Sequence, residues 1–147
     1  AAGNPCKFTS IYRSYNRQVE LFEKKVNKLI GQGYSREAAE KETAKSIAVP
    51  GTSEHHLGLA FDIVDSRYPR LDYYQERMDG QKWLMEHSWE YGFILRYPED
   101  KTQWTGVSYE PWHFRYVGRE LALELQTLGF TPEEYLCYLP EVSHCTG

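Results

Sequence analysis

Two short segments hold most of the side chains that could bind a metal ion and activate water. One is Ser-Glu-His-His-Leu-Gly-Leu-Ala-Phe-Asp at residues 53–62, and the other is Glu-Pro-Trp-His-Phe-Arg at residues 110–115. A catalytic zinc site needs three protein ligands of nitrogen or oxygen type and one open position for water. It also needs a nearby base that does not itself bind the metal. Because the segments supply three imidazoles, a carboxylate within an apolar run and another carboxylate three residues before a histidine, they could form such a site.

Asp62 is the residue that most needs a partner. It lies within Leu-Ala-Phe-Asp-Ile-Val, where an unpaired carboxylate would be costly to bury. A metal ion would satisfy it, and so would an ion pair with an arginine, which is the structural alternative. A single buried histidine is also more often a hydrogen-bonded core residue than a ligand. The inference therefore depends on the whole set of residues.

The order of the motifs resembles that of a known peptidase family. Ser-x-His-x-x-Gly-x-Ala-x-Asp at residues 53–62, followed by Glu-x-Trp-His at 110–113, is similar to the signature of zinc peptidases of the VanY and D-alanyl-D-alanine carboxypeptidase type. Tyr-Arg-Ser-Tyr-x-x-Gln at 12–18 resembles a third motif, and Gly-Phe at 92–93 with Arg-Tyr-Pro at 96–98 resembles a fourth. The resemblance covers most of the chain, and L,D-carboxypeptidases share the same fold.

The resemblance implies a zinc cofactor and a role for each residue around it. It makes His55, Asp62 and His113 the zinc ligands. It makes Glu110 the catalytic base, which takes a proton from zinc-bound water and passes it to the leaving amine. Zinc would polarise the scissile carbonyl and lower the pKa of water to about 7.

The resemblance also implies three contacts to substrate. Arg13 resembles the residue that recognises a substrate carboxylate, for which a planar bidentate donor is suited. An ordinary structural ion pair is the alternative for Arg13. Ser53 and Gln18 resemble polar contacts to the peptide. We expect Arg96 to be structural and Trp112 to fill the core.

The choice of His55 over His56 conflicts with simple strand geometry. In one continuous strand, His56 and Asp62 would share a face and His55 would not. The family motif nevertheless selects His55. The two agree only if the backbone turns near Gly58, which glycine permits. We therefore predict that His55 is the ligand and His56 a supporting or packing residue.

Periodicity and turn residues predict an α+β fold with a small, mostly antiparallel sheet flanked by helices. The resemblance implies a fold like that of the D,D-peptidases and the Hedgehog signalling domain. Helices are predicted after residue 15 to Gly31, from Ser35 to about Ala48 as a solvated flank, from Asp79 to Gly92, through Leu121–Leu128, and from a capping box at residues 131–134. Strands are predicted at Leu57–Asp65, Phe93–Tyr97 and Ser108–Val117.

The length of 147 residues predicts a single catalytic domain over residues 1–147. Family members carry a strand and a helix ahead of the Tyr-Arg-Ser motif, but only ten residues precede Ile11 here. Either an N-terminal segment is missing from this chain or the fold is completed differently.

Composition limits the partners and the location. A net charge of −4 disfavours nucleic acid as a partner. The sequence has neither a signal-peptide pattern at its start nor an apolar run of about 20 residues that could span a membrane. A cytosolic protein and an ectodomain without its leader both fit. The resemblance implies an extracytoplasmic location in the bacterial cell envelope, with any leader or anchor outside this chain.

The three cysteines leave their pairing open. Cys6, Cys137 and Cys145 form no Cys-x-x-Cys pair, so a thiolate zinc site is disfavoured. Cys137 could pair with Cys145, or Cys6 with either of them, and one thiol would remain. A disulfide would support an exported protein.

The leading functional hypothesis is a monomeric zinc carboxypeptidase that removes the terminal D-Ala from peptidoglycan stem peptides. Within the same class, an L,D-carboxypeptidase acting on tetrapeptide stems and a peptidoglycan endopeptidase are the alternatives. Arg13 favours the exopeptidase because a free carboxylate is its natural partner. In a different class stands a non-catalytic zinc-bearing binding module, and Glu110 argues against it. A metal-free structural domain would require Arg13 or Arg115 to satisfy Asp62.

Overall fold

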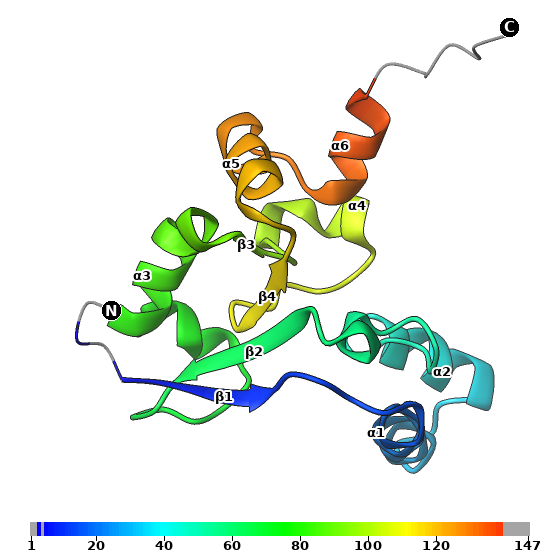
Figure 1. The fold of residues 1–147 in the computed structure, drawn as a ribbon. Coiled ribbons are helices and arrows are strands. Elements are labelled where there is room, and N and C mark those ends of the chain that lie inside the picture. Colours follow the sequence, from blue (N-terminus) through cyan, green and yellow to red (C-terminus); the bar gives the residue numbers. More distant parts are fainter. Residues whose placement is uncertain (1–2, 4, 140–147) are drawn as a thin grey trace, which may run out of the picture.

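The computed structural model describes residue 3 and residues 5–139. Its centre is a four-stranded antiparallel sheet in the order β1-β2-β4-β3 (Figure 1). The strands are β1 (Cys6–Ser10), β2 (Ala60–Asp65), β3 (Phe93–Leu95) and β4 (His113–Tyr116). Helices flank this sheet, so the α+β prediction is confirmed.

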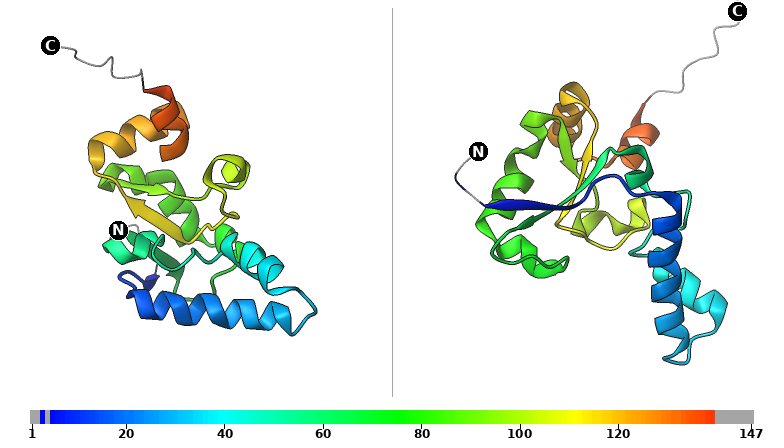
Figure 2. Two further views of the ribbon diagram at one scale, coloured as in Figure 1. Left: turned by 90° about the vertical axis from the view of Figure 1, so that its right-hand side faces the viewer. Right: turned by 60° about the horizontal axis from the view of Figure 1, so that its bottom comes forward.

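Helices α1 (Tyr15–Ile30) and α2 (Arg36–Ala44) lie side by side at one end of the sheet (Figure 2). Phe22 and Val26 of α1 pack against Ala39 of α2 and form a small buried cluster. The prediction that the second helix is a solvated flank was therefore wrong for one of its faces. It begins after the predicted Ser35 cap, but it ends at Ala44 rather than near Ala48.

The remaining helices begin close to where the sequence predicted them, except the one-turn helix at Thr102–Thr105, which was not predicted, and the helix from Asp79 ends at His87 rather than Gly92. They are α3 (Asp79–His87), the one-turn α4 (Thr102–Thr105), α5 (Arg119–Leu128) and α6 (Pro132–Tyr138). Short 3-10 turns η2 (Tyr73–Arg77), η3 (Ser88–Tyr91) and η4 (Glu99–Lys101) add to them. Thr131 and Glu134 form the predicted capping box of α6.

Strand β1 supplies an edge that the sequence did not reveal. The few residues before Ile11 pair with β2, with an irregularity between Phe8 and Ser10. Most of β1 is exposed, so it lacks the alternation of apolar and polar residues that would have predicted it. The strand ahead of the Tyr-Arg-Ser motif is thus present in this chain.

The predicted strand from Leu57 begins three residues later. Glu54–Leu57 forms the 3-10 turn η1, which ends at Gly58 with φ at 67°. This left-handed conformation favours glycine, and the turn expected at this position is confirmed. The other two predicted strands shorten to Phe93–Leu95 and His113–Tyr116.

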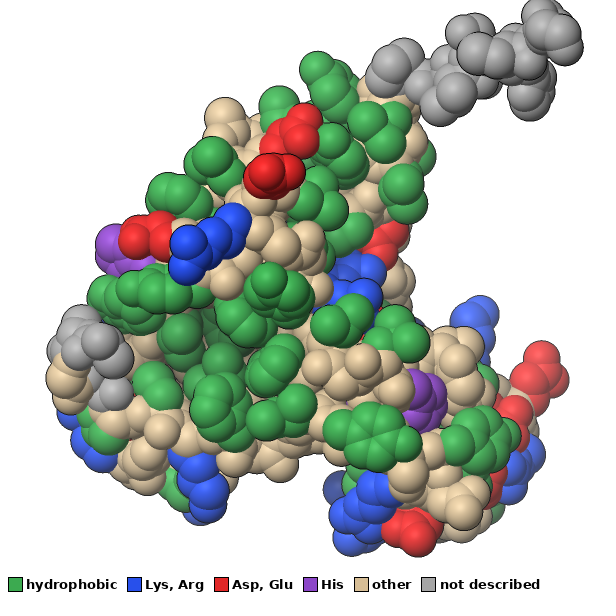
Figure 3. Space-filling view, in the orientation of Figure 1, with side chains coloured by type: hydrophobic (Ala, Val, Ile, Leu, Met, Phe, Trp, Pro, Cys, Tyr) green, Lys and Arg blue, Asp and Glu red, His purple; other side chains and the backbone are tan. Residues whose placement is uncertain are grey.

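A row of aromatic rings crosses one face of the sheet. Phe8, Phe61, Phe93 and Tyr116 follow one another with centroids 6.2, 5.2 and 5.1 Å apart. Figure 3 shows hydrophobic side chains gathered on this side of the molecule. Among the described residues, none of the helices has the length and apolar character that crossing a membrane requires. Cys6 and Cys137 are exposed and are not bonded to each other, and Cys145 lies outside the described residues.

Candidate metal centre

Two of the predicted ligands come from directly paired strand positions. Asp62 of the central strand β2 lies opposite His113 of β4, and opposite Ser10 of β1 on its other side. Residues directly opposite in an antiparallel pair project from the same face of the sheet, so the carboxylate and the imidazole meet. Both side chains are buried.

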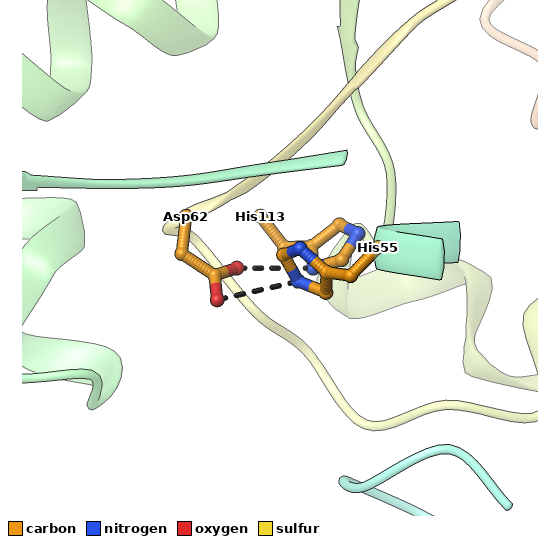
Figure 4. A group of neighbouring side chains, drawn as sticks. All are labelled: His55, Asp62 and His113. Carbon is orange, nitrogen blue, oxygen red and sulfur yellow. Dashed lines mark ion pairs between the residues drawn. The ribbon is translucent and has the colours of Figure 1, made fainter. Parts of the chain in front are cut away.

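The third predicted ligand, His55, reaches the same point from the 3-10 turn η1. The Nδ1 of His55 donates a hydrogen bond to the carbonyl oxygen of Ile11 at 2.7 Å. Because a carbonyl only accepts, the proton of a neutral His55 lies on Nδ1 and leaves a lone pair on Nε2. That Nε2 lies 3.3 Å from Oδ2 of Asp62, and Nδ1 of His113 lies 3.2 Å from Oδ1 (Figure 4).

This arrangement fits a metal cation. Each of the three side chains offers one ligand atom, and these atoms lie within 4.8 Å of one another. Oδ1 of Asp62 is buried and accepts no hydrogen bond from the described part of the chain. Buried polar atoms almost always have partners, and a metal cation between these three ligand atoms would satisfy all of them at once. The contact of His55 with Ile11 is the kind of outer hydrogen bond that orients metal-bound histidines.

The charges of the site favour a cation in the same way. Burial opposes ionisation of Asp62, but His113 and His55 outweigh it and hold the pKa of this carboxyl well below its usual range. Burial also opposes the charged form of His113, yet Asp62, Glu54 and Glu110 raise its pKa to about 9. The three carboxylates around His113 therefore favour a positive charge at this point of the structure.

His56 has no lone pair to offer at this centre. Its Nδ1 donates to the carbonyl oxygen of Arg13 at 2.7 Å, and its Nε2 accepts from the backbone N–H of Gly51 at 3.2 Å. Both ring nitrogens are therefore occupied by the backbone. The structure places His55, and not His56, beside Asp62.

Glu110 lies next to the three predicted ligand residues, but it is not part of the cluster that could hold the metal ion. Its Oε2 lies 3.6 Å from Nδ1 of His113. A tight turn fixes it, because the N–H of Glu110 donates to Tyr97 and its carbonyl accepts from the N–H of His113, both at 3.1 Å. Burial raises the pKa of the Glu110 carboxyl to about 7, while His113 opposes and Asp62 adds to the effect.

Arg13 enters the centre from the loop after β1. Its guanidinium donates to Gln18 at 2.9 Å, to Ser10 at 3.0 Å and to Oδ2 of Asp62 at 3.4 Å. Gln18 is fully buried, and its amide also donates to the carbonyl of Ala48. Gln18 does not line the cleft, so its position fits support of Arg13 better than the predicted contact to substrate.

The centre opens into a cleft of about 560 Å³. Arg13, Ser53 and Glu110 line it together with the three ligand residues. Trp112 is half-buried and also lines it, so the prediction that Trp112 belongs to the core was wrong. The remaining wall is rich in aromatic and basic residues, namely Tyr73, Tyr97, Tyr109, Lys25 and Lys45.

Glu54 is a residue of the site that the sequence did not single out. It begins the turn η1, and its Oε1 accepts a hydrogen bond from Nε of Arg96 at 2.8 Å. Its Oε2 lies 3.7 Å from Nε2 of His113. Burial alone would raise the pKa of Glu54, but His113, Arg96 and Arg115 lower it to about 2. The only sequence signal was an acidic residue directly before the histidine pair.

The fold and the site together define a small α+β structure built around a buried His-Asp-His cluster that could hold a metal ion. The family model of the VanY D-alanyl-D-alanine carboxypeptidases matches residues 1–119. The chain belongs to this family.

Known proteins agree with this assignment. The D-alanyl-D-alanine carboxypeptidase of Enterococcus faecalis is 45% identical over 126 residues, which cover 85% of this chain and 45% of that protein. The chain thus spans about half the length of that curated relative.

Solved structures extend the likeness to three dimensions. VanYB with D-alanine-D-alanine superposes with a TM-score of 0.83 at 42% identity, covering 94% of this chain and 74% of that one. Another structure of VanY from the VanB-type cassette, an E175A mutant with Zn(II), gives 0.78 at 43% identity, covering 91% and 72%. The LD-carboxypeptidase LdcB gives 0.78 at 37% identity, covering 91% and 59%.

Proposed function

We propose that this chain is the catalytic domain of a zinc metallocarboxypeptidase that removes the terminal D-Ala from peptidoglycan stem peptides. One observation carries the proposal. One potential ligand atom from each of His55, Asp62 and His113 lies in a cleft beside a further carboxylate, Glu110. Three ligands and a separate base are the protein's part of a catalytic zinc site.

His55, Asp62 and His113 would hold the zinc ion. A bound zinc ion polarises a carbonyl oxygen and makes water more acidic. The donor set is the nitrogen and oxygen type that zinc accepts, and VanY from the VanB-type cassette has been solved with Zn(II).

Glu110 would be the general base and then the general acid. It would accept a proton from the attacking water and return it to the nitrogen of the departing amino acid. Its backbone is fixed at both ends of the turn before β4, and its carboxylate faces the cleft beside His113. A base held in place next to the reacting atoms needs little reorganisation.

Arg13 would recognise the free carboxylate at the end of the substrate. Its guanidinium is held by Gln18 and Ser10 and lines the cleft next to Asp62. An arginine fixed by other side chains is suited to bind a carboxylate in a defined orientation. A terminal carboxylate requirement favours removal of a single residue over cleavage within the stem, and Ser53 could contact the peptide nearby.

The wider setting follows from the same proposal. The substrate would be the stem peptide of the cell wall, and the domain would act as a monomer outside the cytoplasm. VanYB, which resembles this chain, was solved with D-alanine-D-alanine. An L,D-carboxypeptidase is the second candidate, because LdcB has the same fold at 37% identity.

Incubation with synthetic pentapeptide and tetrapeptide stems, with and without a chelator, distinguishes these activities. We expect chelator-sensitive release of one D-Ala from the pentapeptide, seen by mass spectrometry. Release from the tetrapeptide alone would assign the L,D activity, and cleavage inside the stem would assign an endopeptidase. If no stem is cut in a chelator-sensitive way, the proposed function is wrong.

The matched variant is Glu110→Gln, which keeps the size of the side chain and removes the base. We expect it to retain one zinc ion per chain and to lose at least about 10²-fold in kcat, the contribution of a positioned acid–base group. Near-normal activity in this variant would exclude Glu110 as the base.

A further inference from the structure

Three buried polar atoms meet on the side of His113 that faces away from Asp62. They are Oε2 of Glu54, Nε2 of His113 and a guanidinium nitrogen of Arg115. Within the part of the chain that the structure describes, none of them has a hydrogen-bond partner. Oε2 of Glu54 lies 3.7 Å from Nε2 of His113 and 3.8 Å from Arg115. Both distances exceed hydrogen-bond length, so the structure shows a close approach of Oε2 to each group and not a formed hydrogen bond.

Arg96 fixes the position of Glu54 from the other side. Its Nε donates to Oε1 of Glu54 at 2.8 Å, while its two terminal nitrogens donate to the carboxylate of Glu133 in α6. Arg96 is buried, so this double pairing holds the Glu54 carboxylate with Oε2 directed at His113. Charge-assisted bonds of this kind are strong and directional.

We infer that Glu54 is a positioning residue for the metal site, which accepts a hydrogen bond from Nε2–H of His113 and so keeps the lone pair of Nδ1 directed at Asp62. This inference rests on the proposed zinc site. The two nitrogens of His113 face different carboxylates, with Nδ1 toward Asp62 and Glu110 and Nε2 toward Glu54. The outer hydrogen bond of a metal-bound histidine decides which nitrogen carries the proton.

Ile11 and Glu54 then act alike, because each accepts the ring proton of one histidine and leaves the other ring nitrogen free. The carbonyl of Ile11 keeps the proton of His55 on Nδ1 and frees Nε2. Glu54 would keep the proton of His113 on Nε2 and free Nδ1. The two histidines use opposite nitrogens because they approach Asp62 from different elements, η1 and β4.

The variant Glu54→Gln tests this role. Arg96 still needs an acceptor, so the amide oxygen would face Arg96 and the NH₂ group would face His113. An NH₂ group donates to Nε2, which moves the proton of His113 to Nδ1, the nitrogen that should bind the metal. We expect zinc affinity, measured by competition with a chromophoric chelator, to fall about 10- to 100-fold.

The matched control is Glu133→Gln, which alters the other partner of Arg96 without contacting His113. We expect its zinc affinity to stay within about twofold of the wild type, although its thermal stability in the metal-free state falls as that of Glu54→Gln does. Equal zinc affinities in the two variants would overturn the inference and leave Glu54 a purely structural partner of Arg96. Failure of the wild type itself to bind zinc would instead reject the proposed site.

A second measurement does not depend on how any variant folds. Long-range ¹H–¹⁵N spectra of the zinc-loaded wild type report which ring nitrogen of His113 carries the proton. We expect a protonated Nε2 and an unprotonated Nδ1. A proton on Nδ1 would exclude the proposed hydrogen bond to Glu54.

Discussion

Two aspartates on the same strand, Asp62 and Asp65, are both buried but have opposite surroundings. Their side chains are 3% and 0% exposed, and they lie three residues apart, so they point to opposite faces of the sheet. Arg67 donates to Asp65 from its backbone N–H and its Nε at 2.9 Å and from a terminal nitrogen at 2.6 Å. Oδ1 of Asp62 accepts no hydrogen bond from the described residues, and imidazole nitrogens of His55 and His113 lie 3.3 and 3.2 Å from its carboxylate.

The two aspartates differ in whether the fold itself supplies enough hydrogen-bond donors to the carboxylate. Asp65 has its donors supplied by a residue two positions away, so the fold alone satisfies it. Asp62 has only a long contact to Arg13, and it lies beside two imidazoles that could bind the same cation as its carboxylate. The neighbouring pair His55 and His56 repeats the contrast, because the backbone uses both nitrogens of His56 but only one of His55. In both pairs, the member with a free lone pair belongs to the site.

The largest expected effect of this contrast is on catalysis. Asp62→Asn should lose zinc and at least about 10³-fold in kcat/KM on the stem peptide, because the metal supplies several kcal/mol of transition-state stabilisation. Asp65→Asn should keep activity within about threefold, since its face of the sheet does not reach the cleft. Parallel assays of the two variants, with bound zinc measured in each, check this. A zinc-loaded and active Asp62→Asn protein would remove the basis of the comparison.

The next effect is on metal binding by the two histidines. His55→Ala removes a lone pair from the centre, so zinc affinity should fall by at least about 10²-fold. His56→Ala removes two backbone hydrogen bonds and should mainly lower thermal stability. Equilibrium zinc titrations of both proteins distinguish the roles. If His56→Ala loses zinc and His55→Ala keeps it, the assignment of the ligand is reversed.

How much of this could be predicted from the sequence depends on how local the signal is. Asp62 stood out because it is a charge inside an apolar run, and the capping box at Thr131 depends on adjacent residues. The His55 prediction needed the family motif, since strand parity favoured His56. The turn at Gly58 resolves that conflict by ending η1 before β2 begins.

The features that the sequence did not reveal depend on contacts between distant segments. Glu54 matters because Arg96 and His113, 42 and 59 residues further along the chain, converge on it, and no local pattern encodes that meeting. Strand β1 is exposed and owes its form to pairing with β2. The half-buried position of Trp112 follows from the cleft itself, which only the folded chain creates.

The smallest expected effect is the pH dependence that Asp65 gives to stability. Hydrogen bonds from Arg67 outweigh burial and hold the pKa of Asp65 below its ordinary value. The folded state therefore binds this proton less readily than the unfolded state. The contribution of Asp65 is complete above the unfolded pKa of about 3.9 and is lost as the pH falls through the folded pKa.

Thermal unfolding of the wild type and Asp65→Asn, both kept metal-free with a chelator, isolates this contribution. We expect the wild type to melt roughly 5 °C higher between about pH 6 and 8, and the gap to narrow below about pH 4. Asp62 titrates in both proteins and cancels in the difference, because it has no shared partner with Asp65. Asp79 also lies 4.0 Å from Arg67, but it is largely exposed and its contribution is small. A gap that stays constant down to pH 2 would show that Arg67 does not stabilise the ionised Asp65. The contrast with Asp62 would then rest on the geometry of the hydrogen bonds alone.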